Sequence, residues 1–357
     1  MKRLAAVLLL SLAPLAAAKS RVVRSIRVEW TAPQCAEPGL DWLRYVDPDG
    51  TVHGAHLYDS NEDWTKPRIV QLALGAPPNT LWVADATGTI HRSSDAGCTW
   101  SVAAAVPEVL GSQYGVQFAS RHADRVYVYT GASWIARATS VVRLTGSTVE
   151  TFPAPDASGF VALETDPADS LHLRAVGRSG TAWESHDGAA TWTAHGAPSL
   201  FISFVRSVAF DPSDFNHMLL GTKTQGLWES RDGGRTWTLI QFAGAEVEGV
   251  RFAPSNAGVI YAGVVPSKLM RSMDGGKTFT IVDISFNPPW GRLYYMDNLF
   301  AVSPRDPLTS AAGGERGIGV KIVGPNGVRS TPFDNIGAQV WAPSGTIYYS
   351  QTFAESR

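Results

Sequence analysis

Ser230-Arg231-Asp232-Gly233-Gly234-Arg235-Thr236-Trp237 is the clearest copy of an octapeptide that the chain contains four times. The shared pattern is Ser-x-Asp-x-(Gly/Ala)-x-Thr-(Trp/Phe), and the other copies begin at Ser93, Ser185 and Ser272. The aspartates of successive copies are 92, 45 and 42 positions apart: Asp95, Asp187, Asp232 and Asp274. The first gap equals two periods and predicts one degenerate copy within it. A repeat of about 45 residues is typical of β-propellers and solenoids.

The residues of the octapeptide predict a tight turn between two strands. An aspartate in a turn accepts hydrogen bonds from the backbone N–H groups that follow it, glycine supplies positive φ, and serine and threonine hydroxyls satisfy further backbone groups. Strand-like sequence precedes each copy, as in residues 226–229. Ala189 stands where the other copies have glycine, which predicts a strained or locally rearranged turn.

In this register the octapeptide resembles the Asp-box, also called the bacterial neuraminidase repeat. The resemblance implies a fold-stabilising hairpin on the outer part of a propeller blade, away from the active face, and hence a structural role for Asp95, Asp187, Asp232 and Asp274. The chain is similar to seven-bladed propellers of two groups, the photosystem II stability and assembly factor group and the secreted dispase autolysis-inducing type. These relatives imply a non-catalytic scaffold that binds a protein.

The spacing of the strand-like runs predicts an all-β chain with seven four-stranded antiparallel blades. Complete units begin near Ile69, Val116, Phe160, Ser207, Val250 and Leu299. Residues 339–344 and 346–350 supply two further strands at the end of the chain, and residues 43–46 and 51–53 supply two near its start. We expect these four to form a seventh blade shared between the two ends, because ring closure removes the free sheet edges.

Residues 1–18 predict a secretory signal peptide. Lys2 and Arg3 precede an apolar run over 4–15, and Ala16-Ala17-Ala18 fits a cleavage site after Ala18. The run is too short for a good membrane span. We therefore expect a periplasmic or secreted protein, with a single propeller domain over residues 19–357 and no membrane span.

Composition narrows the classes of partner. The formal net charge is −2, becoming −4 without Lys2 and Arg3, and no basic block is present. Nothing here favours nucleic acid or an anionic membrane as partner. We expect a monomer that uses no cofactor.

The two cysteines, Cys35 and Cys98, predict one disulfide in an exported chain. It would tie the N-terminal segment to the first octapeptide. Without companion histidines at ligand spacing, the cysteines predict no metal site.

Function is expected in the loops on the face opposite the octapeptides, where the sequence singles out residues 56–68, residues 286–297 and Arg206. Trp, Tyr and Arg are common binding anchors, which favours recognition of a protein or a glycan. The predicted binding residues are Tyr58, Asp59, Trp64, Arg206, Trp290, Arg292, Tyr294 and Tyr295. The alternative is that the rings only fill the propeller core, and Phe201 and Phe204 are expected to pack in this way.

A sialidase-like exo-glycosidase is the alternative function, because that family also carries Asp-boxes. The resemblance implies three arginines for the substrate carboxylate, a tyrosine nucleophile assisted by glutamate, and an aspartate acid/base. The matching candidates are Arg68, Arg251, Arg292, Tyr294, Glu248 and Asp63. The family's Arg-Ile-Pro motif is absent, since the chain has Arg68-Ile69-Val70, and sialidases are usually six-bladed. The preferred hypothesis is therefore an exported, non-catalytic binding module.

Overall fold

The computed structural model describes residues 29–54, 69–76, 78–106, 116–130, 140–156, 159–196, 204–266, 268–283, 300–314, 319–331 and 335–352. The regular elements in these ranges are strands β1 to β28. No helix among these residues is long and apolar enough to cross a membrane. The predicted signal peptide lies outside the described residues.

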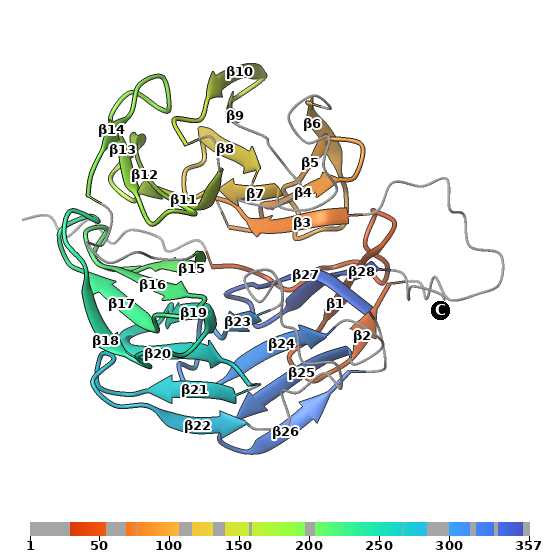
Figure 1. Cartoon of the computed structure of the whole chain (residues 1–357). Helices are drawn as coiled ribbons and strands as arrows, with labels where there is room; N and C mark the ends of the chain where they lie inside the picture. Colours follow the sequence, from red (N-terminus) through yellow and green to blue (C-terminus); the bar gives the residue numbers. More distant parts are fainter. Residues whose placement is uncertain are drawn as a thin grey trace, which may run out of the picture.

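The described strands form seven four-stranded antiparallel sheets, the blades of a β-propeller (Figure 1). Blades one to three contain β3 (Ile69–Leu74), β4 (Leu81–Asp85), β5 (Thr89–Ser93) and β6 (Ser101–Ala105); β7 (Val116–Ala119), β8 (Arg125–Thr130), β9 (Ser140–Thr145) and β10 (Thr148–Pro153); and β11 (Phe160–Asp166), β12 (Asp169–Gly177), β13 (Ala182–Ser185) and β14 (Thr193–Ala194). Blades four to six contain β15 (Val205–Phe210), β16 (Met218–Thr222), β17 (Leu227–Ser230) and β18 (Thr238–Gln241); β19 (Val247–Ala253), β20 (Asn256–Val264), β21 (Lys268–Ser272) and β22 (Thr280–Asp283); and β23 (Phe300–Val302), β24 (Ser310–Gly314), β25 (Gly319–Gly324) and β26 (Gly327–Ser330). Blade seven contains β27 (Asn335–Trp341), β28 (Ile347–Thr352), β1 (Leu43–Val46) and β2 (Val52–His53).

The hydrophobic core lies between the blades. The first strand of each blade is nearest the centre of the ring, and the blades surround it in chain order (Figure 1). Seven buried clusters span the seven boundaries between neighbouring blades. At the boundary of blades four and five, for example, Leu219 and Leu227 pack with Val250 and Ile260. Each blade is thus stabilised by apolar burial against both of its neighbours.

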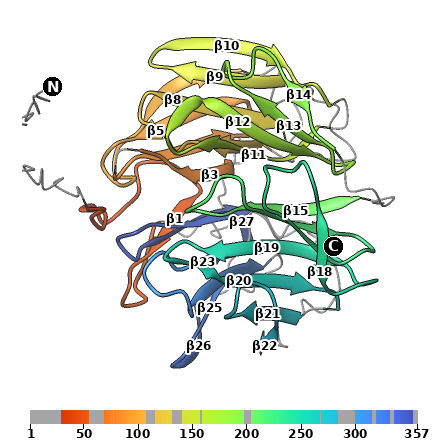
Figure 2. The same cartoon turned by 90° about the vertical axis from the view of Figure 1, so that its left-hand side faces the viewer.

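Blade seven joins the two ends of the chain, as the sequence predicted. Strand β1 pairs with β28, and Tyr45 lies opposite Tyr348 in that ladder. The sheet order is β2-β1-β28-β27, so the C-terminal strands are the inner pair and the N-terminal strands the outer pair. Figure 2 shows β1 and β27 in the same part of the ring, and β28 lies between them in the sheet. The closed ring gives blade seven a packed neighbour on both sides, blade six and blade one, so neither end of the array is left open.

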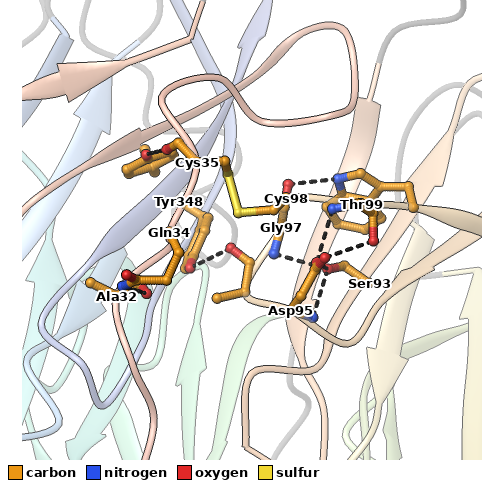
Figure 3. Close-up of a disulfide and its surroundings, with 12 residues drawn as sticks. Ala32, Gln34, Cys35, Ser93, Asp95, Gly97, Cys98, Thr99 and Tyr348 are labelled. Carbon is orange, nitrogen blue, oxygen red and sulfur yellow. Dashed lines mark hydrogen bonds between the residues drawn. A yellow bond between two sulfur atoms is a disulfide. The ribbon is translucent and has the colours of Figure 1, made fainter.

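The predicted disulfide is confirmed and lies at the boundary of blades seven and one (Figure 3). Cys35 and Cys98 are bonded, with their Cα atoms 5.7 Å apart. Beside the disulfide, Gly39 N donates to the carbonyl of Gly97 at 3.3 Å. A Cβ on Gly39 would lie 2.3 Å from the Cys98 carbonyl oxygen, so this approach requires glycine. The hydroxyl of Tyr348 in blade seven donates to Ala96 of blade one at 2.8 Å.

All four octapeptides form the same hydrogen-bonded turn between the third and fourth strands of a blade. In the copy around Asp232, one carboxylate oxygen accepts from Ser230 Oγ and Thr236 N, both at 2.9 Å, and the other accepts from Thr236 Oγ1 at 2.7 Å. Burial alone would raise the pKa of Asp232, but hydrogen bonds from Thr236 and Ser230 outweigh it and lower that pKa. In the most exposed copy, hydrogen bonds from Thr278 and Ser272 lower the pKa of Asp274 to about 2.

The turn that contains Ala189 is strained but not rearranged. Its φ is 78°, in the left-handed region that favours glycine. Ala189 N still donates to Ser185 Oγ at 3.0 Å, the bond that the glycine at this position makes in the other copies. The hydrogen bonds of the aspartate turn therefore hold the alanine in an unfavourable conformation.

Two opposite faces follow from the antiparallel strand order. Turns from the first to the second strand and from the third to the fourth lie at one end of each blade, which we call the octapeptide face because it carries Asp95, Asp187, Asp232 and Asp274. At the other end, the amino face, each first strand begins and each second strand passes into the third. Of the residues expected from sequence to form a site, Arg206 and Glu248 lie at the starts of β15 and β19, at the amino face.

Removing the disulfide should destabilise the ring. The bond closes a loop with a sequence separation of 63 residues, and chain entropy predicts a loss of about 4 kcal/mol for the Cys35→Ser/Cys98→Ser protein. Urea unfolding measures this loss. A reductant should lower the stability of the wild type and leave the double variant unchanged; equal stability of the two proteins would contradict a role at the blade boundary.

Removing one turn aspartate should have a smaller effect. We expect Asp232→Ala to lower the free energy of unfolding by about 1–2 kcal/mol, because Ser230 Oγ and two donors of Thr236 lose their acceptor. Asp124→Ala is the control, since Asp124 has a side chain 64% exposed and only a 3.8 Å ion pair with Arg125. Equal chemical denaturation midpoints for the two variants would show that the turn contributes nothing.

Candidate functional site

The inner strands carry a recurring irregularity at the amino face. In five of the described inner strands the register against the second strand slips by one residue near the strand start, which is a β-bulge. The bulged residues are Val70, Val161, Arg206, Glu248 and Gly337. Two of them are charged, and they belong to adjacent blades. A bulge redirects a side chain and is common beside functional sites, so Arg206 and Glu248 define the centre of a candidate site.

Arg206 links blades four and five. Its Nε and Nη2 donate to one carboxylate oxygen of Glu246 at 2.9 and 2.7 Å. Glu246 immediately precedes β19, and both side chains are about one-fifth exposed, at 20% and 22%. The ion pair therefore sits at the surface of the amino face, where the two inner strands begin.

Glu248 is the unusual member of this group. The residue is 8% exposed, and its Oε2 atom has no hydrogen-bond partner among the described residues. Burial, and then the charge of Glu246, raise the pKa of the Glu248 carboxyl to about 7, although Arg206 acts in the opposite direction. A buried polar atom without a partner costs free energy, and such groups cluster at functional sites. A cationic group placed at Oε2 would supply the missing partner.

An exposed aromatic ring borders the charged residues. Phe204, two positions before Arg206, is 43% exposed. The guanidinium carbon of Arg178 lies 4.7 Å from its ring centre, and the Lys223 ammonium lies 5.9 Å away. The backbone is held at the same place, because Lys223 N donates to Phe204 O at 3.0 Å and Val205 N donates to Arg178 O at 3.1 Å.

We call this group the amino-face site: Arg178, Phe204, Arg206, Lys223, Glu246 and Glu248. It combines an aromatic face, two cations over that face, an ion pair and a buried carboxyl. Arg178 and Lys223 lie in the turns between the second and third strands of blades three and four. The group thus draws its side chains from three neighbouring blades, three to five.

The structure describes only part of the set predicted from sequence. Arg206 and Glu248 lie together in the amino-face site, and the Phe204 ring, which was expected to pack, is substantially exposed. Arg251, further along β19, donates from Nη1 to the carbonyl of Val250 at 2.8 Å. The remaining candidates lie outside the described residues: Tyr58, Asp59, Asp63, Trp64, Arg68, Trp290, Arg292, Tyr294, Tyr295 and Phe201.

Sequence reasoning missed Arg178 and Lys223. Both occupy short polar turns that resemble ordinary hairpin loops, 45 positions apart. This separation equals the blade period and was a usable signal, because it places both side chains at equivalent points of adjacent blades. That the two cations share one aromatic ring is a property of the tertiary structure.

The fold and the site define a class of protein, the seven-bladed β-propellers with a polar and aromatic surface at the amino face. No family model matches the chain. Over 164 residues the chain is 32% identical to dispase autolysis-inducing protein from Streptomyces mobaraensis, and the match covers 46% of this chain and 40% of that protein. The match therefore spans about two-fifths of the curated relative.

Solved structures with the same fold include a GH74 enzyme and YCF48. The Niastella koreensis GH74 enzyme has a TM-score of 0.59 and 16% identity, with 80% of this chain and 51% of that chain covered. YCF48 from Cyanidioschyzon merolae has a TM-score of 0.58 and 15% identity, and the match covers 80% of this chain and 95% of that chain. A structure of YCF48 bound to D1 peptide has a TM-score of 0.55 and 13% identity, and the match covers 89% of this chain and 100% of that chain. At these identities the likeness establishes the fold alone.

Glu248→Gln should change how stability depends on pH. The folded pKa of about 7 lies above the ordinary value, so the neutral carboxyl supports folding in acid, and this contribution is lost as the pH rises through 7. Glutamine resembles the neutral form at every pH. We expect the variant to gain on the order of 1 kcal/mol over wild type at pH 8 and little at pH 4.

Urea titrations of both proteins at the two pH values measure this difference. NMR of the Glu248 side-chain carboxyl carbon locates the titration directly. A midpoint near pH 4, or a stability difference that does not change with pH, would contradict the buried, partnerless carboxyl.

Proposed function

We propose that this protein is an exported, non-catalytic scaffold whose amino-face site binds an extended segment of a protein partner. The observation that carries the proposal is that inner strands of adjacent blades begin with an exposed Phe204 ring on one and a buried Glu248 carboxyl on the other, whose Oε2 has no partner among the described residues. Aromatic and arginine side chains are common anchors in protein recognition. An apolar side chain of the partner would cover Phe204, and a lysine, arginine or terminal amine would reach Glu248.

The comparisons support a peptide as the type of ligand. YCF48, which shares this fold, has a structure bound to D1 peptide. The same fold also occurs in a GH74 enzyme, so the fold does not decide between binding and catalysis. We choose binding over catalysis because of the polar residues of the amino-face site.

The disulfide supports export, because such bonds persist in oxidising compartments. We propose a periplasmic or secreted protein with the signal peptide over residues 1–18 and one propeller domain over 19–357. It acts as a monomer without a nucleic acid partner, and the four turn aspartates serve the fold.

A glycosidase remains the second candidate function because of one observation. A carboxyl with a pKa of about 7, as in Glu248, is suited to general acid catalysis at neutral pH. The nucleophile and two arginines that a sialidase would need lie among the residues the structure does not describe. Hydrolysis of a fluorogenic sialoside by the purified chain, abolished in both Tyr294→Phe and Arg292→Ala, would replace the binding proposal.

A peptide library displayed on phage tests the proposed function. Panning against the immobilised chain should enrich peptides that contain an apolar and a cationic residue. We expect Phe204→Ala and Glu248→Gln each to weaken binding of the enriched peptides about tenfold, since each removes one anchor.

Ile281→Ala is the matched control, because Ile281 is 51% exposed on β22, the outermost strand of blade five. The Ile281→Ala variant should bind the enriched peptides as tightly as the wild type does. The proposal is wrong if no peptide is enriched, or if all three substitutions weaken binding equally.

A further inference from the structure

We propose that blade three binds a divalent transition-metal ion, expected to be Zn²⁺, at the octapeptide face. The coordinating residues are His172, Glu184 and His186, and His195 lies beside them. One ligand atom from each of the first three residues lies within 4.8 Å of the others. This is a separate site from the amino-face site. The sequence predicted no metal, because His172 lies on β12 and His195 just after β14, and only folding brings them to Glu184 on β13 and His186 in the turn that follows.

Glu184 is the centre of the cluster. Its Oε1 lies 2.9 Å from His172 Nε2, and its Oε2 lies 2.7 Å from His195 Nε2 and 3.8 Å from His186 Nε2. Its side chain is only 6% exposed. Both carboxylate oxygens of Glu184 thus face imidazole nitrogens of neighbouring histidines.

His172 is already oriented as a metal ligand. Its Nδ1 lies 2.8 Å from a carboxylate oxygen of Asp166, so the opposite ring nitrogen, Nε2, faces Glu184. A carboxylate behind the far nitrogen of a histidine is the usual arrangement in metal sites, where it sets the tautomer and raises the basicity of the ligand. The ring of His186 stacks on that of His172, with centres 4.3 Å apart.

Metal binding requires His186 to leave its stack on His172, because an imidazole binds through the lone pair in its ring plane and two rings only 19° apart cannot both aim at one ion. Zinc holds nitrogen and oxygen ligands at about 2.0–2.2 Å, so neighbouring ligand atoms lie about 3.3 Å apart. The distances around Glu184 already bracket this value. The side chain of His186 is 70% exposed and can adjust without disturbing the core. Imidazole nitrogens with one carboxylate suit zinc and its transition-metal neighbours rather than calcium or magnesium.

Two arginines compete with the metal for Glu184. Arg174 is buried, donates to Oε1 at 2.7 Å and also binds the carbonyl of Phe215, so it stays in place. Arg235 donates to Oε2 at 2.9 Å from the octapeptide of blade four, and its side chain is 49% exposed. An ion pair exposed to this extent stabilises little, so Arg235 can leave when a metal binds Oε2.

Blade four contains a natural comparison. The same frame recurs there as Asp211, His217 and Glu229, with His217 Nδ1 2.7 Å from Asp211 and Nε2 2.9 Å from Glu229. At the position of His186, however, blade four has Arg231, whose Nη2 lies 2.7 Å from Glu229. At the position of His195 it has Ile240. Arginine thus satisfies the glutamate of blade four, whereas blade three offers additional imidazoles.

Isothermal titration of the untagged full chain with Zn²⁺, and absorption spectra with Co²⁺, test the site. We expect one saturable site in the wild type. His186→Arg, which copies blade four, should weaken binding at least tenfold, and Asp166→Asn should weaken it about tenfold by releasing the orientation of His172. Arg235→Gln should strengthen binding several-fold, because it removes the competing cation.

His217→Gln in blade four is the control and should leave the zinc affinity unchanged. Thermal unfolding of each metal-free variant shows whether it is folded, and the Co²⁺ spectrum reports tetrahedral nitrogen and oxygen coordination independently of stability. The proposal is overturned if the wild type shows no saturable binding, if His186→Arg binds as tightly as the wild type, or if His217→Gln removes the same site.

Discussion

The pairing of β1 with β28 is the constraint on which the rest of the structure depends. A propeller blade is stable only between two neighbours, because its apolar side chains are buried at both boundaries. If blade seven did not form, blades one and six would each expose a buried face, and the first strands would lose their fixed positions around the axis. The ladder from Tyr45 to Tyr348 therefore maintains the whole ring, including the site carried by blades three to five.

The disulfide and the first octapeptide act on the same boundary. Cys98 lies within that octapeptide. The carbonyl oxygen of Ala96, in the same turn, accepts a hydrogen bond from the Tyr348 hydroxyl of blade seven. A turn that satisfies its own backbone groups through Asp95 is rigid enough to anchor a covalent bond to the N-terminal segment. The octapeptide is thus a local device in every blade and a ring-closing device in blade one.

The two faces use their carboxylates differently. At the octapeptide face, donors surround the carboxylates, as around Asp232 and Glu184, and their charge is favoured. At the amino face, the bulge at Glu248 places a carboxyl where burial and Glu246 oppose its charge. A fold bears such a cost at few positions, and they are often those that meet a ligand. The two faces thus place their carboxylates in opposite electrostatic environments.

One polar pair recurs at hairpins in several blades. Asp47 and His53, Asp85 and His91, Asp166 and His172, and Asp211 and His217 are each six positions apart, and each pair is in contact. In each pair an aspartate at or just after the end of one strand contacts a histidine in or just before the next strand, although the hairpins differ in their position within the blade. Only in blade three do the described residues add further histidines to such a pair.

The sequence by itself determined the blade period, the number of blades, the split seventh blade and the disulfide. These are local or periodic properties: an aspartate, a glycine and two hydroxyl residues specify a turn, and equal spacing specifies repetition. Of the predicted site, Arg206 and Glu248 were found because they begin inner strands. Tertiary structure alone decided that Glu248 is buried without a described partner, that Arg178 and Lys223 share the Phe204 ring, and that three histidines surround Glu184. These contacts depend on the register of bulges and on the packing of neighbouring strands and blades, which spacing along the chain does not encode.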